Sequence, residues 1–168
     1  MVTILERSGD RIKIRCAYCQ GKGKDPFGIP SKLSNCQVCK GKGTVWLTEP
    51  VEECAFCMGD GIHPGRRLTC TVCKGKGVVT TIGKRIACAY CEGTGVHRGE
   101  MQLPCTVCGG TGRVKIVEPV VKCLYCDGTG VDPALVAYKP PCHVCGGKGV
   151  VPAVKREERA GVKPGDEG

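Results

Sequence analysis

The sequence predicts an all-β protein dominated by metal sites, an elongated tandem array of zinc knuckles and β-hairpins with little hydrophobic core. Two observations predict this fold class. All sixteen cysteines fall in eight copies of one octapeptide, C-x-x-C-x-G-x-G. The 168 residues include only one Trp, four Tyr and two Phe, so bound metal has to replace much of the missing core.

The cysteine spacing predicts closed metal sites. Two C-x-x-C pairs supply four thiolates, which is the ligand set of a tetrahedral structural zinc site with no open position. Sixteen thiolates therefore imply about four metal ions per chain. We expect zinc, and iron in rubredoxin-like sites is the alternative, because tetrahedral thiolate ligation suits both metals. The candidate ligands are Cys16, Cys19, Cys36, Cys39, Cys54, Cys57, Cys70, Cys73, Cys88, Cys91, Cys105, Cys108, Cys123, Cys126, Cys142 and Cys145.

Glycines recur two and four positions after the second cysteine of every copy, as Gly21 and Gly23 do in the first. Backbone N–H groups that point at a thiolate stabilise its charge. Aiming those amides requires a turn with positive φ, which glycine adopts at little steric cost. The glycines are therefore expected to shape the metal-binding turns.

The eight copies alternate between two kinds, which defines a four-unit repeat. An aromatic knuckle, with Tyr or Phe before its second cysteine, is followed each time by a valine knuckle, with Val there. A period near 35 residues is typical of a repeat array in which each unit contacts its neighbours. The units begin with their aromatic knuckles at Cys16, Cys54, Cys88 and Cys123.

The segments between units predict β-hairpins. Residues 44–53, 78–87 and 113–122 carry β-branched side chains on both sides of a Gly or Pro, and residues 3–15 look similar. The connections inside a unit are rich in turn residues and read as loops, in which Asp25, His63, His97 and Asp132 are expected to cap turns. The expected division is an N-terminal hairpin (1–15), a first zinc-binding region (16–77), a connecting hairpin (78–87), a second zinc-binding region (88–151) and a charged, disordered tail (152–168).

The octapeptide resembles the signature of the cysteine-rich, zinc-binding region of DnaJ-type co-chaperones, which carries four copies. Residues 16–77 look like one such region and residues 88–149 like a second. The resemblance implies extended β-hairpins that bind two zinc ions per region, and a role in handling non-native polypeptides. A J-domain is not part of it, because His63-Pro64 is followed by Gly65 and lies in a short loop.

The resemblance also implies which knuckles share a metal. In that family the first copy pairs with the fourth and the second with the third, and we expect this nested scheme. The two-knuckle repeat favours the alternative, in which each unit closes its own site. Nested pairing joins Cys16/Cys19 with Cys70/Cys73, Cys36/Cys39 with Cys54/Cys57, Cys88/Cys91 with Cys142/Cys145, and Cys105/Cys108 with Cys123/Cys126.

The charge balance bears on the class of partner. The formal charge of +9 would suggest a polyanion, but four zinc ions and sixteen thiolates together carry −8 and leave about +1. Nucleic acid is therefore a less favoured partner than protein. The first residues turn charged before any apolar run develops, and no apolar stretch of transmembrane length follows, so we expect a cytoplasmic protein without membrane insertion.

No constellation of residues predicts an enzyme: there is no nucleophile with its base, no phosphate loop and no open metal site. We expect a chaperone-like protein that offers the strands at 45–47, 78–82 and 114–117 to non-native or partner polypeptides. The main alternative is a scaffold or assembly subunit for one protein complex. A nucleic-acid binder and an electron carrier with iron sites are the remaining hypotheses.

Overall fold

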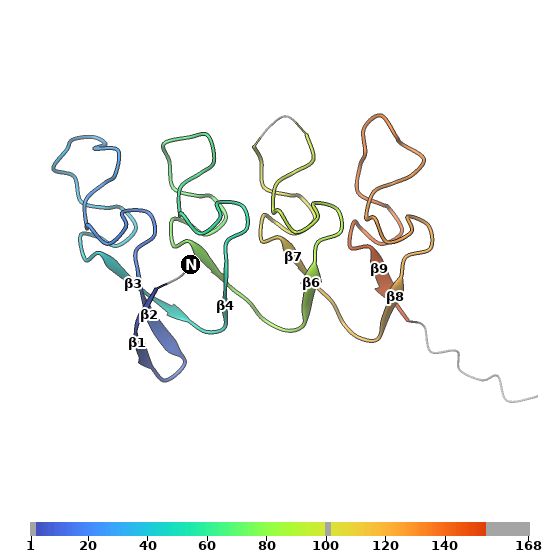
Figure 1. Cartoon of the computed structure of the whole chain (residues 1–168), viewed down its shortest axis with the longest axis horizontal. Helices are drawn as coiled ribbons and strands as arrows, with labels where there is room; N and C mark the ends of the chain where they lie inside the picture. The colour runs from blue at the N-terminus through green and yellow to red at the C-terminus, as the bar shows by residue number, and fades with distance from the viewer. Residues whose placement is uncertain (1–2, 100–101, 154–168) are drawn as a thin grey trace, which may run out of the picture.

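The protein is described from a computed structural model, in which residues 3–99 and 102–153 are placed. The described residues form nine strands and no helix, gathered in four small sheets, which confirms the all-β fold class. Figure 1 shows four similar units side by side in one row, with the intra-unit loops on one side and the connections between units on the other. The predicted disordered tail lies largely outside the described residues.

The strands are short and follow the repeat. The first unit contains β1, β2 and β3, and each later unit contains two strands. In chain order they are β1 (Ile4–Ser8), β2 (Arg11–Arg15), β3 (Thr44–Thr48), β4 (Val51–Glu53), β5 (Val78–Thr80), β6 (Arg85–Ala87), β7 (Arg113–Lys115), β8 (Val120–Lys122) and β9 (Val150–Pro152).

Strand pairing differs from the predicted hairpins. In every unit the strand before the aromatic knuckle pairs antiparallel with the strand after the valine knuckle: β2 with β3, β4 with β5, β6 with β7, and β8 with β9. The predicted connecting hairpin at 78–87 is therefore wrong, because β5 and β6 belong to different sheets, as do β3 and β4. Closing the two knuckles of a unit on each other brings the ends of that unit together, so the ladder forms there. Within residues 3–15, β1 and β2 do pair antiparallel.

The core is thin and local. In the first unit the alternating residues Ile12 and Ile14 of β2 pack with Val45 and Leu47 of β3. Trp46 points to the opposite face of β3, where the Arg11 guanidinium lies 5.4 Å from its ring centre. Apart from the cysteines, the largest buried side chain is Phe56 in the second unit and Tyr90 in the third, each the aromatic of its knuckle. The metal sites are thus the main candidates for holding each unit together.

Neighbouring units share one repeated contact. The backbone N–H of the knuckle aromatic donates to the carbonyl of the first glycine in the next unit's valine knuckle, at 3.2 Å in all three junctions. The alanine before each aromatic packs so closely on the second glycine that an added Cβ there would lie 2.7 Å from the alanine Cβ. The donors and acceptors are Tyr18 to Gly75, Phe56 to Gly110 and Tyr90 to Gly147, and the alanines are Ala17, Ala55 and Ala89.

Ion pairs add to the junction between the second and third units. Glu52 on β4 accepts a hydrogen bond from the Arg113 guanidinium on β7 at 3.2 Å. The Arg85 guanidinium on β6 lies 3.7 Å from the second carboxylate oxygen of Glu52. Because these groups are partly exposed, we expect them to contribute about 1 kcal/mol or less.

Candidate metal centres

The structure brings the sixteen cysteines together in four groups of four. In each group all four sulfur atoms lie within 4.8 Å of one another. Every cysteine is buried except Cys108, which is partly exposed. The groups are Cys16, Cys19, Cys36 and Cys39; Cys54, Cys57, Cys70 and Cys73; Cys88, Cys91, Cys105 and Cys108; and Cys123, Cys126, Cys142 and Cys145.

These groups show that the nested pairing expected from the resemblance is wrong. Each aromatic knuckle shares its site with the valine knuckle of the same unit, so Cys16 lies near Cys36 and not near Cys70. The repeat alternation had pointed to this adjacent scheme. The intra-unit loop is closed at its base by a bridge such as Lys24 with Asn35, and the two knuckles of the unit follow directly on either side of it.

The spacing of the sulfur atoms fits a tetrahedral metal. The Cys16 and Cys36 sulfurs lie 3.9 Å apart and the Cys19 and Cys39 sulfurs 3.7 Å apart, with equivalent distances of 3.7 to 4.0 Å in the other groups. A tetrahedron with metal–sulfur bonds of about 2.3 Å has edges of about 3.8 Å. A disulfide would require about 2.05 Å. The donor sets therefore fit a closed four-thiolate site.

Backbone amides point at the sulfurs as the glycine pattern predicted. The Gly23 N–H donates to the Cys19 sulfur at 3.3 Å, and the Gly43 N–H donates to the Cys39 sulfur at 3.2 Å. Both glycines have a φ of 72°. These hydrogen bonds stabilise thiolate charge, which a metal centre of net charge −2 requires.

The same glycines join the two knuckles of a unit. The Cys16 N–H donates to the Gly43 carbonyl at 2.9 Å, and the Cys36 N–H donates to the Gly23 carbonyl at 2.8 Å. Equivalent reciprocal pairs occur in the other three units. Each second glycine therefore contacts a sulfur of its own knuckle and the backbone of the opposite knuckle, which gives each site an approximate two-fold arrangement.

Burial affects the protonation of the metal-free thiols. Desolvation raises the pKa of Cys16 and Cys36, and it raises that of Cys105 to about 11. Cys126 is one of the thiols shifted the other way: burial raises its pKa, but the Gly130 amide and the neighbouring thiols outweigh this and bring it to about 7. The thiols with a raised pKa must lose a proton when metal binds, which makes metal affinity pH-dependent.

The polar loop residues take structural positions. Asp25 accepts a hydrogen bond at 2.9 Å from the backbone N–H two residues further on, which is a turn-capping contact, and Asp132 does the same at 3.0 Å. The His63 ring stacks edge-on against Phe56 with ring centres 5.2 Å apart, and His97 stacks on its own unit's tyrosine. Within residues 3–99 and 102–153 none of them joins a metal-ligand group.

The repeated contact between units was missed by the sequence reasoning. Its signal was present, because alanine precedes the aromatic in the first three aromatic knuckles and Leu124 replaces it in the fourth. The alanine positions face another unit, whereas Leu124 is exposed to solvent. Within this chain, a small residue at this place therefore marks a knuckle that is followed by a further unit.

The fold and these sites define a cysteine-rich repeat protein with four candidate metal centres. Comparison of the chain with protein-family models, with curated proteins and with solved structures finds no match. In the part of the chain that the structure describes, no helix has the length and apolar character needed to cross a membrane.

Proposed function

We propose that the protein is a non-enzymatic zinc-binding array that binds polypeptides. Zinc is favoured over iron because closed four-thiolate zinc sites serve structure alone, and the surrounding fold depends on such support. The ion would cross-link the two knuckles of each unit and hold the loop between them in a fixed position. Elemental analysis tests the metal, and a red protein containing iron would contradict it.

The likeness to DnaJ-type zinc regions supports this function only in part. The knuckle sequences are similar, but the family's pairing of first with fourth copy does not apply to this chain. The proposal therefore depends on the surface of this molecule and on what that surface can contact.

The observation that carries the proposal is a row of exposed apolar side chains on the intra-unit loops. Leu33, Leu68 and Leu103 occupy similar places, two or three residues before the valine knuckle of the first, second and third units, and all three are exposed. Figure 1 shows that the four loops project from the same side of the array. The loop of the fourth unit adds Leu135, Val136 and Tyr138, also exposed.

Apolar side chains in a row fit a polypeptide that is extended and carries apolar residues at intervals. Each loop alone offers a small contact, but contacts linked through one chain reinforce one another. The strands suggested by the sequence offer less, because Val45, Leu47 and Val114 are buried in their sheets. The exposed residues Ile82 and Val117 follow β5 and β7 in the connections between units, and Figure 1 shows these connections on the side opposite the loops.

The test is binding of a reduced, alkylated and permanently unfolded protein, measured by fluorescence anisotropy with the zinc-loaded chain. If each leucine contributes about 1 kcal/mol when it is partly buried by the client, replacing Leu33, Leu68 and Leu103 by serine weakens binding by about 100-fold. The matched control replaces Ile82 and Val117 by serine and should leave the affinity unchanged. Equal affinity of the triple variant and the unaltered chain would contradict the proposal.

A scaffold for one folded partner is the second candidate, favoured by the unequal loops. The loop of the first unit spans residues 24–35, whereas that of the second spans only 62–69. Unequal loops on a regular array suit a single complementary surface better than many different clients. Affinity purification distinguishes the two: one stoichiometric protein and no affinity for unfolded chains would favour the scaffold.

A further inference from the structure

Each junction between neighbouring units has two sides, a donating half and an accepting half. One end of the array presents the donating half, and the other end presents the accepting half. Inside the array the donating half contains the knuckle aromatic N–H, the alanine before it and the valine of the same unit. The accepting half is the pair of glycines in the next valine knuckle. Among the described residues, no unit covers the donating half of the fourth unit, and no unit covers the accepting half of the first unit.

The donating end carries exposed apolar side chains. Tyr18, Phe56 and Tyr90 are only 1 to 2% exposed, because the following unit covers them, whereas the equivalent Tyr125 is 41% exposed. Beside it Leu124 is 90% exposed and Val144 is 49% exposed. Residues 154–168, which follow the fourth unit in the sequence, contain no cysteine.

The accepting end is open at Gly41. The equivalent glycines Gly75, Gly110 and Gly147 are buried, and an added Cβ on each would lie 2.4 to 2.6 Å from a valine methyl of the preceding unit. Gly41 is exposed and has a similar positive φ, 88°, but the three atoms nearest to the place of its missing Cβ all belong to Asn35 of its own unit, at 3.4 to 3.6 Å. The first unit thus presents the site that takes a valine in every internal junction.

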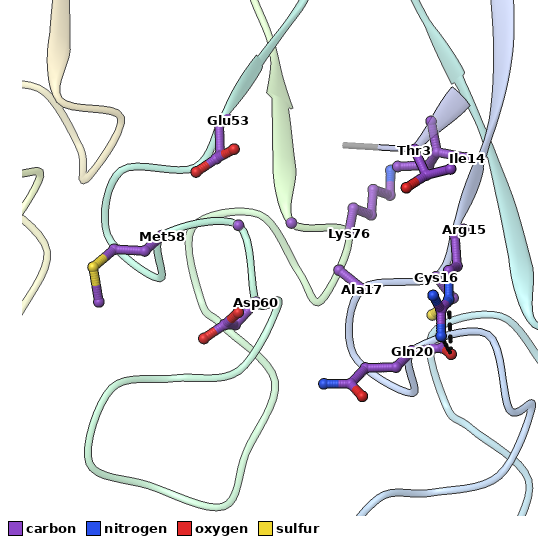
Figure 2. Close-up of a pocket in the computed structure, with 12 residues that line it drawn as sticks. Thr3, Ile14, Arg15, Cys16, Ala17, Gln20, Glu53, Met58, Asp60 and Lys76 are labelled. Atoms are coloured by element: carbon purple, nitrogen blue, oxygen red, sulfur yellow. Dashed lines mark hydrogen bonds between the residues drawn. The ribbon is translucent and has the colours of Figure 1, made fainter. Parts of the chain in front are cut away.

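Leu124 is larger than the alanine of the internal junctions, but the first two junctions have a cavity beside that alanine. Ala17 borders a cavity of about 220 Å³ between the first and second units, and Figure 2 shows it near Lys76, with Glu53 and Asp60 on the second-unit wall. Ala55 borders a cavity of about 330 Å³ between the second and third units. The three additional carbon atoms of a leucine would enter such a space.

We propose that the fourth-unit end of one chain binds the first-unit end of a second copy, head to tail. The Tyr125 N–H would donate to the Gly41 carbonyl, Val144 would fill the space beside Gly41, and Leu124 would enter the adjoining cavity. Such a heterologous contact continues the array and produces open chains or closed rings. The contact does not depend on what the loops bind, so it is independent of the proposed function.

Inside one chain the covalent connection between units raises their effective concentration. Two separate chains lack that connection, so we expect them to associate only at protein concentrations between micromolar and millimolar. Sedimentation equilibrium of the zinc-loaded full chain measures it. Replacing Leu124 by arginine blocks the donating end, and Asn35→Arg places a bulky charged side chain beside Gly41. Both positions are exposed, and Ile82→Arg, in the exposed connection between the second and third units and away from both ends, is the matched control.

The expected result is a mass that rises with concentration for the unaltered chain and for the control, while each end-blocked variant alone stays at one chain. An equimolar mixture of the two blocked variants has one free end of each kind and should form dimers and nothing larger. Three outcomes would overturn the proposal: a single-chain mass for the unaltered protein at all concentrations, a mixture that does not dimerise, or association of Asn35→Arg alone, which would indicate contact between two fourth-unit ends. Zinc content of four per chain, expected for every variant, verifies that each is folded.

Discussion

Replacing Gly23 by alanine tests how the second glycine of a knuckle supports its metal site. A Cβ at this position would lie 2.4 Å from the Gly41 carbonyl oxygen, a backbone atom that no side-chain rotation can move away. The φ of 72° adds about 1–2 kcal/mol for an L-residue. Relieving the contact would shift the Gly23 N–H away from the Cys19 sulfur and its carbonyl away from the Cys36 N–H.

The expected loss is about 3 kcal/mol at the first site, from backbone strain together with one weakened hydrogen bond to a charged sulfur. This corresponds to a roughly 100-fold weaker zinc affinity at one of four sites. Competition with a chelator of known affinity, followed by counting the zinc retained per chain, should show one ion leaving well before the other three.

The matched control is Gly109→Ala, which lies inside a knuckle and also has a positive φ, 62°, but has nothing within 4 Å of its missing Cβ. Other knuckles carry Gln20, Lys40 or Glu92 at the same place with φ near 50°. We therefore expect four zinc ions of nearly unchanged affinity. Equal zinc retention by the Gly23 and Gly109 variants would refute the reasoning that steric contact across the knuckle pair maintains the site.

Three further predictions follow from the metal sites. Chelation should abolish the far-UV signal of β-structure, because the thin cores cannot hold the units alone, and a metal-free chain with an unchanged spectrum would disprove this. Replacing Cys54 and Cys57 by serine should remove one zinc and leave Cys70 and Cys73 open to alkylation, whereas labelling of first-unit thiols, read by peptide mass spectrometry, would indicate nested pairing. Acidification should release zinc, because protons compete for the thiolates and burial favours the neutral thiol, as at Cys105 with its pKa of about 11. A zinc-sensitive dye that detects no release down to about pH 4 would contradict that.

The cysteine and glycine pattern was enough to predict the all-β class, the four-unit division and the direction of the amides at the sulfurs. It was not enough to predict strand partners. Residues 44–53 have the composition of a hairpin, yet β3 pairs with β2 and β4 pairs with β5. The central residue pairs of these two ladders, Lys13 with Trp46 and Glu52 with Val79, are 33 and 27 residues apart in the sequence. β-Propensity reports that a segment fits a sheet and carries no information on which segment lies beside it.

Pairing of the knuckles was mispredicted for a different reason. The resemblance to another protein family supplied a scheme, whereas the alternation of aromatic and valine knuckles described this chain itself. Chain entropy would not have decided between them. Joining Cys16 to Cys36 closes 20 residues and joining it to Cys70 closes 54, a difference of only about 0.9 kcal/mol.

What selects the adjacent scheme is the reciprocal contact of two second glycines. The Gly23 carbonyl accepts from Cys36 while the Gly43 carbonyl accepts from Cys16, and each glycine also donates its N–H to a sulfur of its own knuckle. This arrangement pairs the two knuckles of one unit with each other, so the next unit adds from outside. The outside contact has two parts: the Tyr18 N–H donates to the carbonyl of Gly75, the first glycine of the next valine knuckle, and Ala17 packs on Gly77, the second. In the valine knuckle the first glycine therefore accepts the hydrogen bond from the neighbouring unit, while the second both closes its own unit around the metal and leaves room for the neighbour's alanine.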